Sequence, residues 1–262
     1  MGKPLGRPTR GKTAPNRLRK TDTFLAVAFP AFVRHLPGLY VDLGYGAYPV
    51  TTAETLRRLR EADPRARVLG VEIDPARVAE AQPYAEPGLE FRHGGFDLPL
   101  RPDEAVAVIR AFNVLRQYDE AAVAGALAAL GARLAEGGLL IEGTSDPQGR
   151  LLAFNLFRKA VVLERAGVVL APRLGADFAP RALRAVLPKA FIHHAGPTGA
   201  IDRFFTAWDT AWQRARGAAR THRQRFVAAA LALSDRGGYA LDRRGALLRR
   251  GFLWLGADWP DR

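Results

Sequence analysis

A glycine-containing loop near the start of the chain has the composition of a ligand-binding turn. Asp42 lies two residues before Gly44, and Gly44, Tyr45 and Gly46 follow an apolar run. Glycine lets the backbone turn tightly and approach a ligand, and a helix that follows presents free N–H groups. A dinucleotide-binding loop would need a further glycine where Pro49 stands. The loop therefore indicates a different adenosine-containing cofactor.

A second acidic residue lies at the end of the next apolar run. Glu72 closes this run, and Asp74 and Pro75 then have the composition of a helix N-cap and a first-turn proline. A carboxylate at the tip of a neighbouring strand can accept hydrogen bonds from both hydroxyls of a ribose. We therefore expect Glu72 to bind a nucleoside and Asp74 to cap a helix. Thr51 and Glu54 have the spacing of a capping box for the helix after the glycines.

The elements that position these residues alternate in type along the first half of the chain. Short apolar runs predict strands at Leu39–Leu43, Val68–Ile73, Val106–Phe112 and Leu139–Glu142. Helical patterns occur at Thr21–His35, Thr52–Ala62, Pro75–Ala81 and Glu120–Ala135. Nearly continuous apolar strands between helices predict an α/β protein with a Rossmann-like, mostly parallel sheet and helices on both faces.

The second half of the chain has a different pattern. The strand candidates Leu151–Phe157 and Gly167–Leu170 follow each other without a clear helix between them, which predicts an antiparallel pair at the C-terminal side of the sheet. Pro180–Leu187 has a helical pattern with a first-turn proline. Residues Ile201–Leu233 predict one or two C-terminal helices, and we expect their aromatic side chains to pack in the core: Phe204, Phe205, Trp208 and Trp212.

Composition excludes several classes of chemistry. The 262 residues include no cysteine, which excludes disulfides, thiolate zinc sites and a cysteine nucleophile. No uninterrupted apolar run reaches the roughly 18 residues of a membrane span. We therefore expect a cytoplasmic globular protein that does not enter a membrane.

The net charge of +13 is concentrated at the two ends of the chain. Residues 1–20 contain seven basic and no acidic side chains, residues 200–262 contain twelve arginines against six aspartates, and the part between them is balanced. This asymmetry favours a polyanionic partner, of which RNA is the one we favour, held by the basic N-terminal arm and the C-terminal helices. A genome rich in arginine codons is the alternative explanation.

Residues Leu39–Thr144 resemble the class I S-adenosylmethionine-dependent methyltransferase family. The stretch from Asp42 to Gly46 resembles the first motif of that family, whose acid and glycines hold the methionine end of the cofactor. The stretch from Gly70 to Asp74 resembles the second motif, which implies that Glu72 binds the ribose and Ile73 packs against the adenine. Gly137–Ile141 is similar to the turn into the fifth strand.

Two further stretches fit the family less closely. Phe91–Pro99 resembles the adenine-binding stretch, but Gly95 stands where the family usually has an acid, so the backbone of Phe96 or the carboxylate of Asp97 would make that contact. Arg110–Leu115 resembles the end of the fourth strand, which implies Asn113 beside the sulfonium. The cofactor would then be S-adenosylmethionine, bound by Asp42, Gly44, Tyr45, Gly46, Glu72, Ile73, Gly95, Phe96, Asp97 and Asn113.

Methyl transfer from a sulfonium is an in-line displacement in which the protein mainly aligns the reactants. The Asn/Asp-Pro-Pro-aromatic motif of many amino-group methyltransferases is absent. Asn113 could orient an acceptor or cap the strand end, and His93 is a candidate base. Candidates for substrate binding at the cleft are Arg17, Arg19, Lys20, Arg110, Arg116 and Tyr118. We predict no metal site, and a structural role for the adjacent His193 and His194, because neighbouring side chains diverge and no further ligand has suitable spacing.

This interpretation divides the chain into a basic flexible arm (residues 1–20), a class I methyltransferase domain (21–199) and a basic C-terminal helical extension (200–262). The acceptor stays open. One hypothesis is RNA or an RNA-containing particle, and a second is a small molecule with residues 151–199 as a lid. A third hypothesis is a cofactor-binding regulator without turnover, and a fourth is aminopropyl transfer. The sequence does not determine the oligomeric state.

Overall fold

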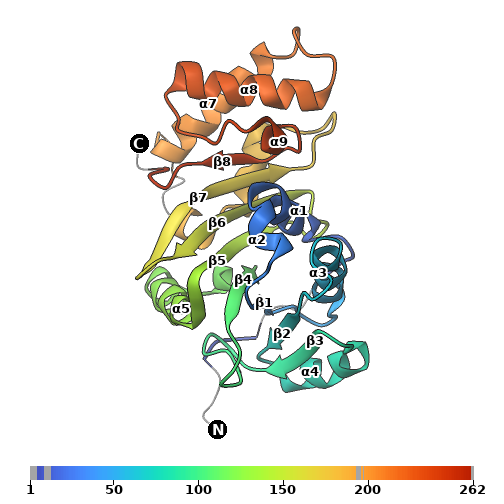
Figure 1. The fold of residues 1–262 in the computed structure, drawn as a ribbon. Coiled ribbons are helices and arrows are strands. Elements are labelled where there is room, and N and C mark those ends of the chain that lie inside the picture. The colour runs from blue at the N-terminus through green and yellow to red at the C-terminus, as the bar shows by residue number, and fades with distance from the viewer. Residues whose placement is uncertain (1–4, 9–12, 193–195, 197, 261–262) are drawn as a thin grey trace.

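One mixed sheet forms the centre of the molecule (Figure 1). A computed structural model describes residues 5–8, 13–192, 196 and 198–260. The strand order is β3-β2-β1-β4-β5-β6-β7-β8. The strands are β1 (Leu39–Leu43), β2 (Val68–Glu72), β3 (Leu89–His93), β4 (Val106–Phe112), β5 (Leu134–Ser145), β6 (Leu151–Lys159), β7 (Leu163–Pro172) and β8 (Leu253–Leu255).

The pairing of the strands changes from parallel to antiparallel after β5. Strands β3, β2, β1, β4 and β5 are parallel neighbours, whereas β6, β7 and β8 each run antiparallel to the strand before them. The first five have the order of a doubly wound α/β fold. The predicted Rossmann-like sheet and its antiparallel pair are therefore confirmed.

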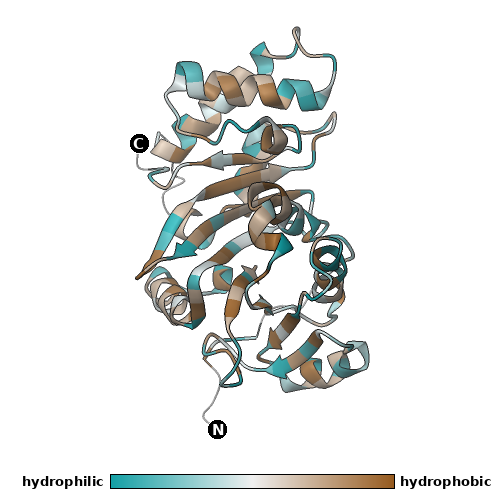
Figure 2. Cartoon of the chain, in the orientation of Figure 1, coloured by the Kyte–Doolittle hydropathy of each residue, from teal (hydrophilic) through white to brown (hydrophobic). Residues whose placement is uncertain are grey.

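Helices cover both faces of this sheet. The α-helices are α1 (Arg19–Ala28), α2 (Pro30–Arg34), α3 (Val50–Arg60), α4 (Pro75–Ala81), α5 (Glu120–Arg133), α6 (Lys189–Ile192), α7 (Ala200–Arg214), α8 (His222–Gly237) and α9 (Gly245–Leu248). Short 3₁₀ turns are η1 (Gln82–Tyr84), η2 (Leu115–Gln117) and η3 (Pro180–Val186). Figure 2 shows that the strands are mostly hydrophobic, whereas hydrophilic residues lie mainly on the outer helices and loops.

Alternate residues of the strands divide the interior into separate cores. Tyr40 of β1 and Phe154 of β6 pack with α1 and α3 on one face, whereas Val41 and Leu140 pack with α5 on the other. Ala153 of β6 points to the second face and packs with α7 and α8. Every residue of β1, β2 and β4 is buried, as expected for parallel strands that are covered on both faces.

Helix boundaries differ from the prediction in two places. The region Thr21–His35 forms two helices that are separated at Phe29, before Pro30. Helix α3 begins at Val50, so Thr51 lies inside it and forms no capping box; the side chain of Glu54 instead accepts a hydrogen bond from the backbone of Asn16 (2.9 Å). Asp74 does cap α4, because its carboxylate accepts from Ala76 N–H (3.0 Å).

The C-terminal part of the chain is joined to the sheet. Helices α7 and α8 form a pair whose aromatic side chains, Phe204, Phe205, Trp208 and Trp212 of α7, are buried as predicted. After α9 the chain returns as β8, which pairs with β7. The expected helical extension therefore also supplies a strand.

The alternative in which residues 151–199 form a lid is wrong for their first half. Strands β6 and β7 occupy residues 151–159 and 163–172 and are interior strands of the sheet. Because both strands are paired on two sides and mostly buried, this segment cannot move as a lid without disrupting the sheet.

Candidate functional site

The loop between β1 and α3 is fixed to the end of β2. Gly44 and Gly46 have positive φ angles, +71° and +89°, which glycine adopts without the steric cost of a side chain. Gly44 N–H donates to Val71 O (2.7 Å), and Gly46 N–H donates to Glu72 Oε2 (3.0 Å). The predicted residues of the two motifs thus lie next to each other.

Glu72 is completely buried at this junction. Its Oε1 accepts hydrogen bonds from Ile73 N–H (2.9 Å) and Asp74 N–H (3.3 Å) and lies 3.8 Å from Arg77 Nη1. The carboxylate organises both loops. Because each carboxylate oxygen has two lone pairs, Oε2, with the bond from Gly46, has capacity for a further hydroxyl donor.

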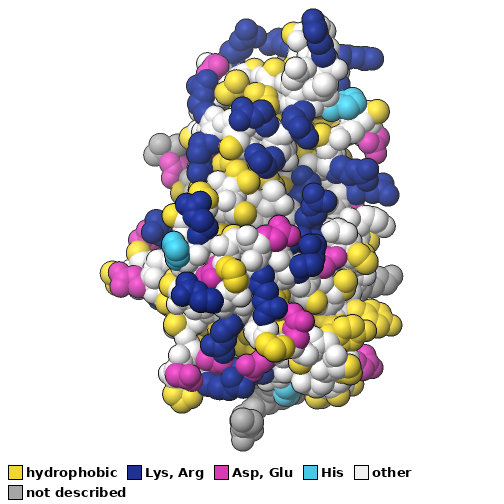
Figure 3. Space-filling view, turned by 45° about the vertical axis from the view of Figure 1, so that its right-hand side comes forward, with side chains coloured by type: hydrophobic (Ala, Val, Ile, Leu, Met, Phe, Trp, Pro, Cys, Tyr) yellow, Lys and Arg dark blue, Asp and Glu magenta, His cyan; other side chains and the backbone are white. Residues whose placement is uncertain are grey.

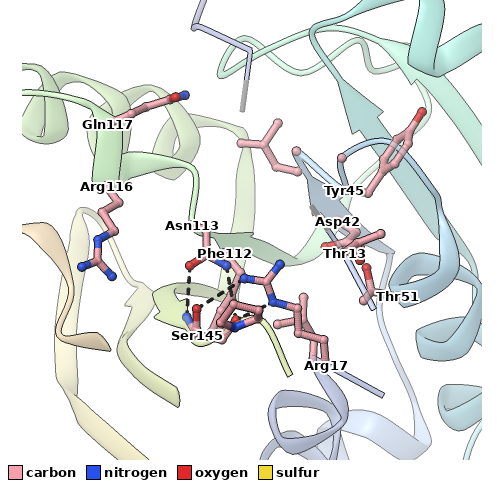
Figure 4. A pocket seen from close by; sticks show the side chains of 15 residues that line it. Thr13, Arg17, Asp42, Tyr45, Thr51, Phe112, Asn113, Arg116, Gln117 and Ser145 are labelled. Carbon is pink, nitrogen blue, oxygen red and sulfur yellow. Dashed lines mark hydrogen bonds between the residues drawn. The ribbon is translucent and has the colours of Figure 1, made fainter. Parts of the chain in front are cut away.

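A cleft of about 570 Å³ lies at the carboxyl ends of β1, β4 and β5 (Figure 4). Seven of the predicted site residues line this cleft, whereas its other lining residues were not predicted as part of a site: Thr13, Leu18, Leu43, Thr51, Phe112, Gln117, Ser145 and Pro147. The full lining comprises Thr13, Arg17, Leu18, Asp42, Leu43, Gly44, Tyr45, Gly46, Thr51, Phe112, Asn113, Arg116, Gln117, Ser145 and Pro147.

Asn113 and Ser145 join the ends of β4 and β5 inside the cleft. Asn113 has a φ of +60°, and its Oδ1 accepts from Ser145 N–H (3.1 Å) while its Nδ2 donates to Ser145 Oγ (3.3 Å). Arg17 Nε donates to Ser145 Oγ (3.0 Å) and to Asp146 O (3.1 Å), as Figure 4 shows for the serine. Burial lowers the pKa of Arg17. The strand-capping role of Asn113 is therefore present, and Arg17 carries positive charge into the cleft.

The prediction that Arg110 lies at the mouth of the cleft is wrong, because its side chain is completely buried. It is the register partner of Asp42 on the neighbouring strand, so both side chains point to the same face of the sheet. Arg110 Nε and Nη2 donate to Asp42 Oδ1 (2.9 Å) and Oδ2 (2.8 Å), and Nη1 donates to Asp22 of α1 (2.8 Å). Although burial opposes its charge, Asp42 and Asp22 raise the pKa of Arg110 above its ordinary value.

This pairing changes what Asp42 can do. Its carboxylate also accepts from Thr52 Oγ1 (2.8 Å), so a guanidinium and a hydroxyl already bind it. Asp42 lines the cleft and holds α1 and α3 against the sheet through these bonds. Because Gly44 N–H and Gly46 N–H donate to the end of β2, the polar groups that this loop can offer to a ligand are the remaining backbone groups of residues 44–46.

The other predicted basic residues divide between the cleft and its surroundings. Arg116 lines the cleft and donates to Ala185 O (3.0 Å). Arg19 and Lys20 do not line it; Lys20 Nζ lies 5.3 Å from the centre of the Phe252 ring, and burial followed by the charge of Arg19 lowers the pKa of Lys20 to about 8.

The predicted base, His93, is not directed into the cleft. Its ring nitrogen Nε2 lies 3.0 Å from Ile73 O, and the side chain is exposed at the end of β3. It lines neither the cleft nor the groove described next. Two strands, β2 and β1, lie between β3 and β4 in the sheet, so His93 at the end of β3 is distant from Asn113 at the end of β4.

A groove next to the cleft contains the predicted adenine-side residues Ile73, Gly95 and Phe96, whereas Asp97 does not line it. It is lined by Leu5, Gly6, Arg7, Leu43, Gly44, Glu72, Ile73, Gly94, Gly95, Phe96, Val114 and Tyr118. Tyr118 therefore lies in the groove rather than at the cleft mouth, with its ring 5.4 Å from that of Phe96. The remaining free volume is about 20 Å³, room for roughly one water molecule.

Residues of the expected flexible arm fill this groove. Phe96 N–H donates to Leu5 O (2.9 Å), and Leu5 N–H donates to Asp97 Oδ1 (3.3 Å). Arg7 N–H donates to the Tyr118 hydroxyl, and Gln117 Nε2 donates to Arg7 O (3.0 Å). The described part of the arm thus makes specific contacts that composition did not predict.

Neither metal ligands nor a spanning helix is found in the described residues. No group of three or more His, Asp or Glu side chains there could hold a metal ion. His193 and His194 lie outside the described residues. Within the same ranges, no helix is long and apolar enough to cross a bilayer.

Comparisons with known proteins give partial structural likenesses. No protein-family model matches the sequence, and no curated protein matches it. Similar solved structures include magnesium protoporphyrin IX methyltransferase from Synechocystis PCC 6803 with bound S-adenosylmethionine (22% identity, TM-score 0.36), which matches over 48% of this chain and 58% of that chain. An S-adenosylmethionine-dependent methyltransferase from Mesorhizobium loti matches with 22% identity and a TM-score of 0.32 over 45% and 54% of the two chains.

A DUF574 family protein from Streptomyces avermitilis is also similar, with 18% identity and a TM-score of 0.39 over 49% of this chain and 52% of that one. Each likeness thus spans about half of both chains. The fold assignment rests on the strand order and directions of this chain itself.

Proposed function

We propose that this chain is an S-adenosylmethionine-dependent methyltransferase. The observation that carries the proposal is that the groove and the cleft meet at Leu43 and Gly44, which line both. One elongated site therefore runs along the carboxyl ends of β2, β1 and β4, where open α/β sheets bind nucleoside ligands. The groove would hold the nucleoside, and the cleft would hold the methionine end and the methyl acceptor.

The polar groups in and beside the groove can pair with the hydrogen-bonding groups of an adenosine. Phe96 N–H is a donor and the carboxylate of Asp97 an acceptor, and adenine presents a ring-nitrogen acceptor beside an amino donor. Glu72, at the adjoining loop, is a buried carboxylate with spare acceptor capacity for ribose hydroxyls. Ile73 and Val114 supply apolar contacts in the same groove.

The cleft side would orient the reacting atoms. The bound cofactor supplies a methyl group on a sulfonium, and the protein needs mainly to align it with the acceptor. Residues 44–46 line this space, and Asn113, fixed by Ser145, presents a rigid amide. Because Arg110 and Thr52 bind Asp42, we assign Asp42 to holding the loop rather than to direct contact with the cofactor.

For the acceptor, we favour RNA. A second cavity of about 470 Å³ is lined by Arg216, Arg220, His222 and Arg225, with no acidic residue in its lining. Arg225 lies 3.9 Å from the centre of the Trp212 ring, and burial together with the charge of Arg216 lowers the pKa of Arg225. Guanidinium groups and aromatic rings are the usual contacts for phosphates and bases.

The topology places this basic cavity on the same edge of the sheet as the cleft. Ser145 of β5 pairs with Leu152 of β6, and Leu152 pairs with Ala171 of β7. The end of β7, which is followed by the cavity-lining residues Ala176, Phe178 and Ala179, therefore lies on the side of Ser145. Figure 3 shows Lys and Arg outnumbering acidic side chains over the upper part of the face in view, where α7 and α8 lie.

A small-molecule acceptor is the second candidate. The volume of the cleft, about 570 Å³, falls within the roughly 300 to 1,000 Å³ of typical small-molecule sites. A compact acceptor would fit into the cleft itself, beside Asn113 and Arg17. The basic cavity would then have no part in catalysis.

Incubation with methyl-labelled cofactor and a fractionated cell lysate tests the proposal. We expect label in the RNA fraction, and its loss with Gly46→Val, because a side chain at a φ of +89° strains the loop and obstructs the approach of the cofactor. Label in the small-molecule fraction alone would indicate that the acceptor is a small molecule and not RNA. Cofactor binding without label in any fraction would instead support a non-catalytic regulator.

A further inference from the structure

The N-terminal segment Leu5–Arg7 occupies the groove like a ligand. Its contacts are mainly made by the backbone: Leu5 O accepts from Phe96 N–H (2.9 Å) and Leu5 N–H donates to Asp97 Oδ1 (3.3 Å). The residue Leu5 as a whole is 56% exposed. The backbone N–H and C=O of one residue, Leu5, therefore use the donor and acceptor that an adenine edge would use.

We infer that Leu5–Arg7 is an internal competitor of the nucleoside, an autoinhibitory contact that the cofactor must displace before it binds. The inference rests on the proposed function, because it takes the groove as the site of the adenosine. Only about 20 Å³ stays free beside the segment, so a purine ring and the segment cannot be present together. Both would also need the single N–H of Phe96.

The unusual glycine of the adenine-side stretch supports this inference independently. A Cβ atom at position 95 would lie 1.9 Å from Leu5 O and 2.7 Å from Leu5 C, closer than real Cβ contacts allow. Gly95 stands where the resembled family usually has an acid. Any acidic residue there would exclude the segment, so the departure from the family pattern creates the space that Leu5 occupies.

Gly6 has the matching feature on the segment itself. Its φ is +139°, a conformation that residues with side chains rarely adopt, and a Cβ atom there would lie 3.1 Å from Ile73 Cδ1 and 3.3 Å from the Tyr118 oxygen. The segment thus passes close to the wall of the groove at a glycine. Since the competitor belongs to the same chain, its effective concentration is high, on the order of millimolar for short tethers.

The variant Gly6→Val tests the competition without changing the folded domain. The strained backbone and the contact with Ile73 should expel the segment, so calorimetry should show S-adenosylhomocysteine binding at least about threefold more tightly than to the intact chain, since a blocked site reduces apparent affinity by its open fraction. Deletion of residues 2–8 should give the same gain. Leu5→Ala is the matched control: it keeps the backbone contacts, and we expect its affinity to equal that of the intact chain.

The outcomes separate the two proposals. Equal affinity in the intact chain, Gly6→Val and the deletion would overturn the competition but leave the proposed function standing. Weaker binding by Gly6→Val and by the deletion variant would show that the segment closes over the cofactor, and this result would also overturn the competition. Absence of binding in all variants would overturn the proposed function and, with it, the competitor.

Hydrogen exchange gives a second readout that needs no turnover. If the segment is displaced, S-adenosylhomocysteine should accelerate exchange in an N-terminal peptide containing Leu5 and Arg7, because their N–H groups lose Asp97 and Tyr118 as acceptors. Slower exchange of this peptide in the presence of the ligand would contradict the inference.

Discussion

Glu142 is a buried acid that the proposed chemistry does not use. It lies in β5, is 3% exposed, and accepts a hydrogen bond from Asn155 Nδ2 (2.8 Å) on β6. Burial raises the pKa of Glu142 from 4.5 to about 7, although the bond from Asn155 acts in the opposite direction. Asn155 Oδ1 has no hydrogen-bond partner, and only the protonated form of Glu142 has a donor to offer it.

This pKa makes stability depend on pH. Between about pH 4.5 and pH 7 the folded chain holds the proton of Glu142 more tightly than the unfolded chain, so the free energy of unfolding should fall as pH rises through this window and not change further above it. In Glu142→Gln this contribution is absent. We expect the stability of the variant relative to the intact chain to increase by about 2 to 3 kcal/mol from pH 5 to pH 8 in urea unfolding.

Glu136→Gln is the matched control, because Glu136 lies exposed on the same strand. Its stability relative to the intact chain should change little between the two pH values. A pH-independent difference for Glu142→Gln would mean that Glu142 is ionised in the folded protein.

Site residues were predictable where local sequence fixes their position. Gly44, Gly46 and Glu72 lie at strand ends that the apolar runs define, and the structure places them together. Arg110 was placed wrongly because its partner Asp22 comes from a helix 88 positions earlier. Ser145 was missed because β5 extends three residues beyond the predicted strand end.

At the scale of elements, the junction of β7 and β8 depends on one glycine. Gly167 has a φ of +146°, and a Cβ atom there would lie 2.2 Å from Leu255 O and 2.5 Å from Trp254 Nε1. Both contacts belong to β8, which pairs with β7 from Val168 to Leu170. The C-terminal strand can therefore join the sheet only if position 167 has no side chain.

We expect Gly167→Ala to destabilise the protein by about 2 to 4 kcal/mol, because strain and a backbone collision act at one buried junction. Thermal unfolding measures this directly. Gly125→Ala, on the exposed face of α5 with no atom within 4 Å of the new Cβ, should stabilise by about 0.5 to 1 kcal/mol. Equal effects of the two substitutions would show that β8 does not pack as described.

The predictability of the elements follows their periodicity. Strands β1, β2 and β4 are nearly continuous apolar runs, and their prediction is confirmed. The three-residue strand β8 has too short a pattern to be recognised, and its pairing depends on β7, more than 80 residues earlier in the sequence. Such non-local pairings leave no periodic signal.

At the scale of the whole molecule, both basic ends of the chain pack against the rest of the fold. The N-terminal residues fill the groove, and Arg17 donates to Ser145 at the end of β5. The C-terminal residues add β8 to the antiparallel side of the sheet, and Arg244 Nη1 donates to Ala28 O of α1 (3.0 Å). From the net charge we predicted that the two basic ends lie apart from the core, and the charge did not predict these contacts. Charge counts describe partners in solution and contain no information on packing.

The central claim is that the groove and the cleft together form one S-adenosylmethionine site. The most direct test is calorimetry of the chain lacking residues 2–8 with S-adenosylhomocysteine and with NADH, together with the same chain carrying Glu72→Gln. The account predicts binding of S-adenosylhomocysteine that Glu72→Gln weakens by about 1 to 3 kcal/mol, the cost of leaving ribose hydroxyls without their ionised acceptor, and no binding of NADH. Binding of NADH, or unchanged affinity for S-adenosylhomocysteine in Glu72→Gln, would contradict it.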